Sequence, residues 1–132
     1  MSTECAGCGN FPYELDETWG CFNWLGKLNN QGRPVIWRAA KPISAIREVF
    51  EKRVRPLKAD EMPDHLCRNI LCVNVIWHVE AVTRRENELR KSFAYLCAKK
   101  KCPRGHEMRS ALTTPWGGRL CRTCHGEQKR AA

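Results

Sequence analysis

The chain has 132 residues, a net charge of +9, nine cysteines and four histidines. This length fits one small domain, or one domain with an appendage, whose modest core would gain from bound metal ions. No apolar run approaches the roughly 20 residues that cross a bilayer, which argues against a membrane protein. The first ten residues lack the pattern of a signal peptide, so we expect a cytoplasmic location, with cysteines that bind metal or stay as thiols.

The positive charge is unevenly distributed along the chain. Residues 1–83 carry ten basic and ten acidic side chains, whereas residues 84–132 carry thirteen basic and only four acidic ones. A basic C-terminal third favours a nucleic-acid backbone as partner, because clustered lysines and arginines neutralise phosphates. The alternative is a solvated basic tail that keeps the protein soluble.

The N-terminal segment, residues 1–17, gives little structural information. It contains the pair Cys5-x-x-Cys8. This spacing is compatible with half a zinc site or with thiol redox chemistry, but the strand and helix pattern expected around a redox motif is absent. Residues 21–32 are typical of a short strand with turns, and the apolar run 34–38 predicts a strand.

The middle of the chain alternates helical and extended patterns. Apolar residues recur at helical spacing over 43–54, which predicts a helix capped by Ser44 and stopped by Pro56. Two extended segments follow, 63–66 and 79–82, separated by a long loop.

A second helix is predicted over about residues 83–98. It opens on Thr83 with Glu86 three residues later, the pattern of a capping box in which each side chain satisfies the other's free amide. The order from residue 63 onward is therefore strand, loop, strand, helix. The lysine run 99–101 marks a boundary to a segment with few apolar residues.

The loop between the two extended segments carries candidate zinc ligands. Cys67, Cys72 and His78 follow one another at short spacing, and Cys21 can supply a fourth ligand from the N-terminal strand. Zinc favours four cysteine or histidine ligands in structural sites, and such a site would pin the loop. The alternative is that the cysteines are small buried side chains.

A second zinc pattern lies near the C-terminus. Cys102 and His106 precede Cys121 and Cys124, which gives C-x3-H-x14-C-x2-C. Too few apolar residues lie between these ligands to hold a fold, so metal binding would supply the folding free energy. His125 is a spare histidine beside Cys124 that could compete as a ligand.

An acid–base pair precedes the first zinc-type cysteine. A neutral His65 imidazole could accept a proton from water, and the Asp64 carboxylate could bind a hard cation. Asn87, in the first turn of the second predicted helix, offers an amide oxygen of the same kind. An isolated Asp-His pair is usually a surface pair. Here the candidate base, the candidate oxygen ligands and the loop of candidate zinc ligands all fall within 24 residues, and this combination favours a metal-dependent nuclease.

The stretch from Asp64 to Asn87 resembles the HNH endonucleases common in bacteriophages. The matching segments are Asp64-His-Leu-Cys-Arg-Asn69, Leu71-Cys-Val-Asn74, His78-Val-Glu80 and Val82-Thr-Arg-Arg-Glu-Asn87. Cys21-Phe-Asn-Trp-Leu-Gly26 is similar to an upstream Cys-x-x-Trp-x-Gly segment of that family. The C-terminal ligand pattern resembles the zinc ribbon in which many of the phage proteins end.

The resemblance implies a fold and a chemistry. The fold is an α+β, zinc-stapled ββα-metal (His-Me finger) core over residues 18–98, followed by a basic zinc-ribbon-like module over 99–132. His65 would be the general base, and Asp64 and Asn87 would bind one catalytic Mg²⁺ or Mn²⁺. Two structural Zn²⁺ ions are implied, with Cys21, Cys67, Cys72 and His78 holding the first and Cys102, His106, Cys121 and Cys124 the second.

The implied activity is hydrolysis of phosphodiester bonds in double-stranded DNA by a monomer or a homodimer. The residue that would brace the phosphate remains open between Arg68 and Arg84. The segment 75–77 before His78 is one residue longer than in the family. This departure motivates the alternative of a non-catalytic, zinc-dependent DNA-binding or packaging-accessory module on the same scaffold.

Overall fold

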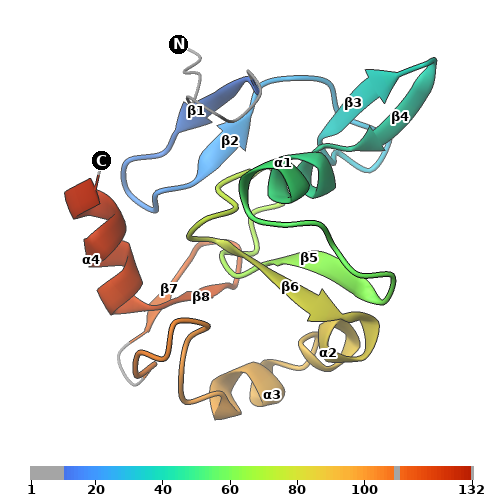
Figure 1. The fold of residues 1–132 in the computed structure, drawn as a ribbon. Helices are drawn as coiled ribbons and strands as arrows, with labels where there is room; N and C mark the ends of the chain where they lie inside the picture. Colours follow the sequence, from blue (N-terminus) through green and yellow to red (C-terminus); the bar gives the residue numbers. More distant parts are fainter. Residues whose placement is uncertain (1–10, 109–110, 132) are drawn as a thin grey trace.

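The computed structural model describes residues 11–108 and 111–131, so the Cys5 and Cys8 pair lies outside the described residues. Within these ranges the chain forms four antiparallel two-stranded sheets and four helices (Figure 1), which confirms the expected mixture of helices and small sheets. No helix in these ranges is long and apolar enough to span a membrane. The elements in chain order are β1 (Tyr13–Leu15), β2 (Phe22–Trp24), β3 (Val35–Arg38), β4 (Lys41–Ser44), α1 (Ala45–Arg53), β5 (Glu61–His65), β6 (Val79–Thr83), α2 (Arg84–Leu89), α3 (Phe93–Ala98), β7 (Leu112–Thr113), β8 (Arg119–Leu120) and α4 (Arg122–Ala131).

The main core lies where α1 meets β2 and the loop that leads into β6. Helix α1 begins at Ala45, capped by the Ser44 hydroxyl, which accepts from the Arg47 amide. The predicted cap is therefore confirmed. The predicted helix start at residue 43 is wrong, because residues 41–44 pair with β3 as strand β4. The buried apolar side chains of this core are Phe11, Trp24, Ala45, Val49, Phe50, Val73, Val75 and Val79.

Strands β5 and β6 form the hairpin that carries the candidate acid–base pair. They pair from Glu61 opposite Thr83 to His65 opposite Val79. Helix α2 follows β6 directly and contacts both strands. The two extended segments predicted around residues 63–66 and 79–82 are thus strands of one hairpin, and the order strand, loop, strand, helix is confirmed.

The single helix predicted over residues 83–98 is wrong, because the chain forms two helices, α2 and α3. Ser92 interrupts the helix and caps α3, its hydroxyl accepting from the Tyr95 amide at 3.3 Å. Thr83 caps α2 as predicted. The Glu86 carboxylate does not complete the capping box, since it bonds Arg90, Tyr95 and Lys99 instead. Glu86 therefore ties α3 and the segment after it to α2.

The C-terminal segment packs against the loop between β5 and β6. The Thr114 hydroxyl donates to the Cys67 carbonyl at 2.6 Å, and the Gln128 amide donates to the Gly20 carbonyl at 2.9 Å. Arg104 reaches the Ile76 carbonyl at 2.9 Å. These bonds connect the second predicted metal module to the chain segments that carry the first.

At Gly118 the C-terminal segment lies directly against the backbone of Cys67, and this contact provides a test of the packing. A Cβ atom at Gly118 would lie 2.4 Å from the Cys67 carbonyl carbon, so Gly118→Ala forces backbone apart. We expect a loss of about 1–3 kcal/mol in unfolding free energy. At Gly126, in α4, the nearest atom is an Arg130 nitrogen at 3.4 Å. Gly126→Ala should therefore be neutral, or stabilising by up to about 1 kcal/mol. Thermal denaturation at a fixed zinc concentration measures both, and equal melting temperatures would contradict this packing.

Candidate metal centres and acid–base site

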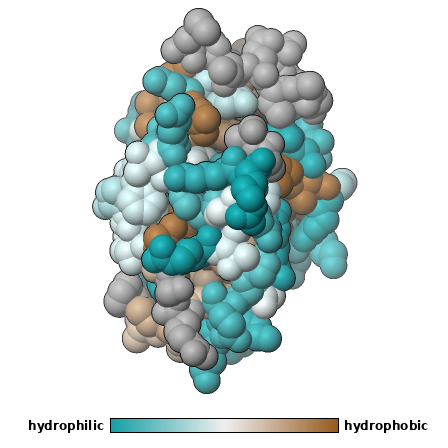
Figure 2. Space-filling model, turned by 90° about the vertical axis from the view of Figure 1, so that its left-hand side faces the viewer, coloured by the Kyte–Doolittle hydropathy of each residue, from teal (hydrophilic) through white to brown (hydrophobic). Residues whose placement is uncertain are grey.

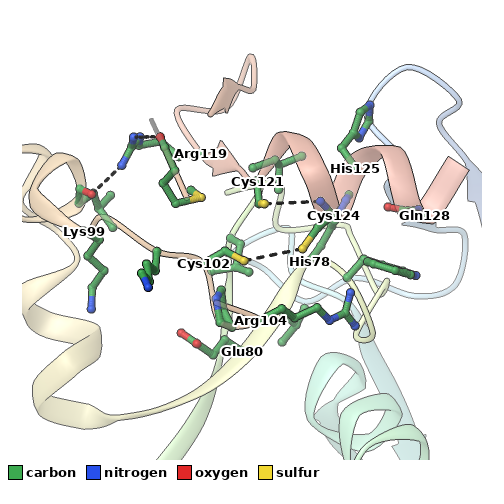
Figure 3. Close-up of a pocket in the computed structure, with 18 of the residues that line it drawn as sticks. His78, Glu80, Lys99, Cys102, Arg104, Arg119, Cys121, Cys124, His125 and Gln128 are labelled. Carbon is green, nitrogen blue, oxygen red and sulfur yellow. Dashed lines mark hydrogen bonds between the residues drawn. The ribbon is translucent and has the colours of Figure 1, made fainter. Parts of the chain in front are cut away.

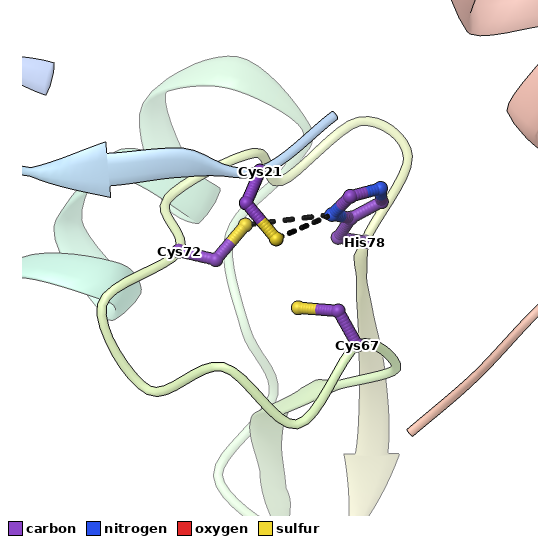
Figure 4. A group of neighbouring side chains, drawn as sticks. All are labelled: Cys21, Cys67, Cys72 and His78. Atoms are coloured by element: carbon purple, nitrogen blue, oxygen red, sulfur yellow. Dashed lines mark hydrogen bonds between the residues drawn. The ribbon is translucent and has the colours of Figure 1, made fainter. Parts of the chain in front are cut away.

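Four side chains from three segments meet in the first cluster. Cys21 precedes β2, Cys67 and Cys72 lie in the loop after β5, and His78 immediately precedes β6. All four are buried, and their ligand atoms lie within 4.8 Å of one another (Figure 4). The His78 Nδ1 atom lies 3.6 Å from Cys21 Sγ and 3.5 Å from Cys72 Sγ. Tetrahedral zinc, with bonds of about 2.0–2.3 Å, requires ligand atoms at about this separation.

The chemistry of this cluster also suits a soft divalent ion. Hydrogen bonds from the Cys67 and Cys72 thiols lower the pKa of Cys21, which favours a thiolate there. Thiolates, not thiols, bind metal. Three sulfurs and one imidazole nitrogen form a ligand set typical of structural zinc. The cluster could therefore hold a zinc ion, with the four ligands that the sequence predicts.

Two buried asparagines hold the loop around this cluster, and the sequence reasoning missed both as supporting residues. Asn74 is 1% exposed, donates to the Gly20 carbonyl at 2.7 Å and accepts from the Trp77 amide. Asn69 donates to the Asn23 side chain at 2.6 Å. An asparagine in a loop between metal ligands is the available signal, because its side chain readily bonds nearby backbone.

The segment 75–77 before His78 does not displace that histidine from the cluster. Val75 is buried in the main core, and the Arg104 guanidinium stacks over the Trp77 ring at 3.9 Å. The side chains of Val75 and Trp77 are therefore both packed, and the His78 Nδ1 atom lies within 3.6 Å of two cluster sulfurs.

The second cluster gathers the four C-terminal ligands predicted from the sequence. The His106 Nδ1 atom lies 3.4 Å from Cys102 Sγ, 3.6 Å from Cys121 Sγ and 3.3 Å from Cys124 Sγ. Cys121 and Cys124 bracket the first turn of α4, which fixes their spacing. The group could hold a second zinc ion. His125 is not part of it, and its Nδ1 is buried without a hydrogen-bond partner among the described residues.

A cavity of about 230 Å³ lies beside the second cluster. Side chains of both metal groups line it, together with polar groups from β6 and α4 such as Glu80 and Gln128 (Figure 3). Because its walls include His78, Cys102 and Cys121, the cavity lies between the two candidate metal clusters.

His65 ends β5 with a defined ring orientation. Its Nε2 atom lies 2.8 Å from the Cys72 carbonyl oxygen. A carbonyl can only accept, so Nε2 carries the hydrogen, and in the neutral ring Nδ1 keeps a lone pair. Burial lowers the pKa of the half-buried imidazole, which favours that neutral form. The carbonyl that orients His65 belongs to a metal-cluster ligand, which links the first cluster to the candidate base.

Asp64 points into a group of arginines. It is 5% exposed, and its two carboxylate oxygens accept from Arg68 at 2.6 Å and from Arg90 at 2.9 Å. Arg90 also bonds Glu80 and Glu86. The ion pairs with these acids raise the pKa of Arg90 against the opposing effect of burial, so it stays charged. Sequence reasoning missed Arg90, whose partners lie up to 26 residues away.

Asn87 lies on α2 one helical turn before Arg90, so the two share a helix face. It is half-buried, and no hydrogen bond of its side chain is found among the described residues. A carboxylate offers about four lone-pair positions, and two arginines occupy two of those of Asp64. Asp64 and Asn87 each offer oxygen atoms of the kind that a hard cation prefers, and Arg68 and Arg90 already bond the two carboxylate oxygens of Asp64.

Comparison of the chain with protein-family models, with curated proteins and with solved structures finds no match in any of the three.

Proposed function

We propose that this chain is a divalent-metal-dependent DNA endonuclease. The observation that carries the proposal is the hydrogen bond from His65 to the Cys72 carbonyl, which leaves Nδ1 free as a base. The proposal is also supported by the position of that carbonyl on a candidate zinc ligand, Cys72, and by the packing of α2 against the hairpin β5–β6. A neutral, oriented imidazole beside oxygen ligands is what hydrolysis of a phosphodiester requires.

The reaction follows from these side chains. The Nδ1 atom of His65 accepts a proton from water, and the resulting hydroxide attacks phosphorus while the bond to the 3′ oxygen breaks. The leaving 3′ oxygen takes a proton from solvent water, so the products are a 5′-phosphate and a 3′-hydroxyl. Asp64 and Asn87 would hold one Mg²⁺ or Mn²⁺, which supplies charge stabilisation for the transition state and the leaving oxygen. A monomer with one such site cuts one strand, and a homodimer cuts both.

Arg68 is the better of the two candidates for bracing the phosphate. Its guanidinium lies against Asp64, one residue from His65, and its side chain is 25% exposed. Arg84 is exposed in the first turn of α2, where its amide bonds the Asp60 carbonyl at the opposite end of β5. A phosphate at His65 would draw Arg68 away from Asp64 and leave the carboxylate to the cation.

The metal dependence tests this arrangement. Asn87→Ala removes one proposed ligand, so we expect the Mg²⁺ concentration for half-maximal cleavage of a labelled duplex to rise by about tenfold or more. Asn30→Ala, at an exposed position in the turn before β3, serves as control and should match the wild type. An unchanged Mg²⁺ dependence in Asn87→Ala would remove Asn87 from the metal site.

The second candidate function is a non-catalytic, zinc-dependent DNA-binding module. The observation that favours it is the pair of guanidinium groups on Asp64, since both carboxylate oxygens are already neutralised. The basic C-terminal third fits either function. Hydrophilic side chains cover much of the face that carries α4, and the hydrophobic patches there are small (Figure 2). This candidate requires salt-sensitive DNA binding with no cleavage in Mg²⁺ or Mn²⁺.

A further inference from the structure

The hairpin β3–β4 projects away from the rest of the molecule (Figure 1). Its two strands are joined by Ala39 and Ala40, both in the left-handed region, with φ of 49° and 62°. Glycine or asparagine normally fills such a turn, because a side chain there is strained. A two-residue turn with both φ values positive matches the natural twist of a hairpin, so the tip is a narrow, twisted two-stranded ribbon.

The tip of this ribbon places two like charges opposite each other. Arg38 and Lys41 are directly paired in the strand register. Like charges at such a position destabilise a hairpin. Glu48 bonds Arg38 at 3.0 Å, but the Arg38 side chain remains 52% exposed. Lys41 forms no ion pair with any described residue. The arrangement suits an external polyanion, which would neutralise both side chains.

A large apolar side chain stands on the opposite face of the ribbon. Trp37 is 54% exposed, the most exposed of the large hydrophobic residues that the structure describes. It pairs with Pro42 across the strands. It also lines an open groove whose walls include the core residues Phe11 and Trp24. The indole therefore offers an uncovered flat surface on the ribbon face opposite the two basic residues.

The ribbon is connected to the candidate base. Helix α1 contacts both β3 and β5, the strand that ends in His65. One helix therefore connects the ribbon to the strand that carries His65.

We propose that the hairpin β3–β4 is a DNA-binding ribbon that enters the major groove of the duplex. Arg38 and Lys41 contact phosphates, and Trp37 packs against the groove wall. The major groove, about 12 Å wide, admits a two-stranded ribbon. The choice of duplex DNA rests on the proposed function, whereas the charge and the exposed indole belong to the hairpin itself. The ribbon would position the DNA so that one phosphate reaches His65.

Fluorescence anisotropy with a labelled 20-base-pair duplex tests the ribbon, using the zinc-loaded full chain without Mg²⁺. Replacing Arg38 and Lys41 together by Gln should weaken binding about tenfold or more and lower the salt-dependence slope by about 2. Trp37→Ala should weaken binding about fivefold or more, and Trp37→Phe should recover most of the loss. Glu48→Gln should strengthen binding, because it releases Arg38 from its ion pair.

Lys58→Gln is the matched control, since Lys58 is exposed and lies before β5 at the end remote from His65. It should change the affinity by less than about twofold, because a distant surface charge is screened. Wild-type affinity and salt slope in the Arg38 and Lys41 double variant would overturn the ribbon. An equal loss of affinity for a single strand of the same sequence would also overturn it, because a single strand has no groove.

The outcomes for the ribbon and for the nuclease are separable. If the wild type binds the duplex and cuts nothing in Mg²⁺ or Mn²⁺, while the hairpin variants lose binding, the endonuclease proposal fails and the ribbon stands. If the hairpin variants bind and cut as the wild type does, the ribbon fails and the endonuclease proposal stands. Melting temperature and zinc content show that each variant is folded.

Discussion

Replacing His65 by Ala is expected to lower the rate of DNA cleavage by about 10²–10⁴-fold, the contribution of a positioned general base. The physical reason is the free Nδ1 lone pair, which the hydrogen bond from Nε2 to the Cys72 carbonyl leaves available for a proton from water. Single-turnover cleavage of a labelled duplex at saturating Mg²⁺ measures the chemical step directly.

His65→Gln is the companion variant, because the Gln side chain can still donate a hydrogen bond to the Cys72 carbonyl but offers no basic nitrogen. It should retain the melting temperature, both zinc ions and the DNA affinity of the wild type while losing activity as His65→Ala does. Wild-type cleavage by the folded Gln variant would exclude His65 as the base.

Replacing Cys72 by Ala is expected to have the largest effect on folding. Structural zinc sites contribute an apparent binding free energy of about 10–16 kcal/mol, comparable with the whole stability of a small domain, about 5–15 kcal/mol. Loss of one ligand from the first cluster should release its ion and unfold the loop between β5 and β6. Zinc analysis and circular dichroism of the purified variant measure both effects.

Cys97→Ala is the matched control for this substitution, because Cys97 is exposed near the end of α3 and belongs to neither cluster. The control should keep two zinc ions per chain and the wild-type spectrum. A Cys72→Ala protein with the same zinc content and the same melting temperature would show that the first cluster is a packing arrangement of thiols.

The sequence predicts those features that depend on residues close together in the chain, namely the ligand spacings and the helix caps. The ligand spacing from Cys67 to His78 and from Cys102 to Cys124 predicted both clusters, since few other arrangements place four soft ligands so close together. The caps at Ser44 and Thr83 were also predictable, because a hydroxyl before a helical pattern satisfies a free amide.

Features that depend on long-range contacts could not be read from the sequence. The helix predicted across residues 83–98 is divided at Ser92, which is extended and caps a new helix, and Glu86 then bonds Tyr95 and Lys99 across the break. The ion pairs of Asp64 with Arg68 and Arg90 depend on the placement of α2 against β5. Strand β4 was missed because Lys41–Ser44 has little strand character apart from its pairing with β3.

The central claim is that a metal-pinned loop orients His65 to hydrolyse DNA, and incubation of supercoiled plasmid with the zinc-loaded protein and Mg²⁺ tests it most directly. We expect open-circular DNA to accumulate with time, followed by linear DNA if the protein dimerises. Plasmid that stays supercoiled in both Mg²⁺ and Mn²⁺, with the protein folded, zinc-loaded and bound to it, would contradict the claim.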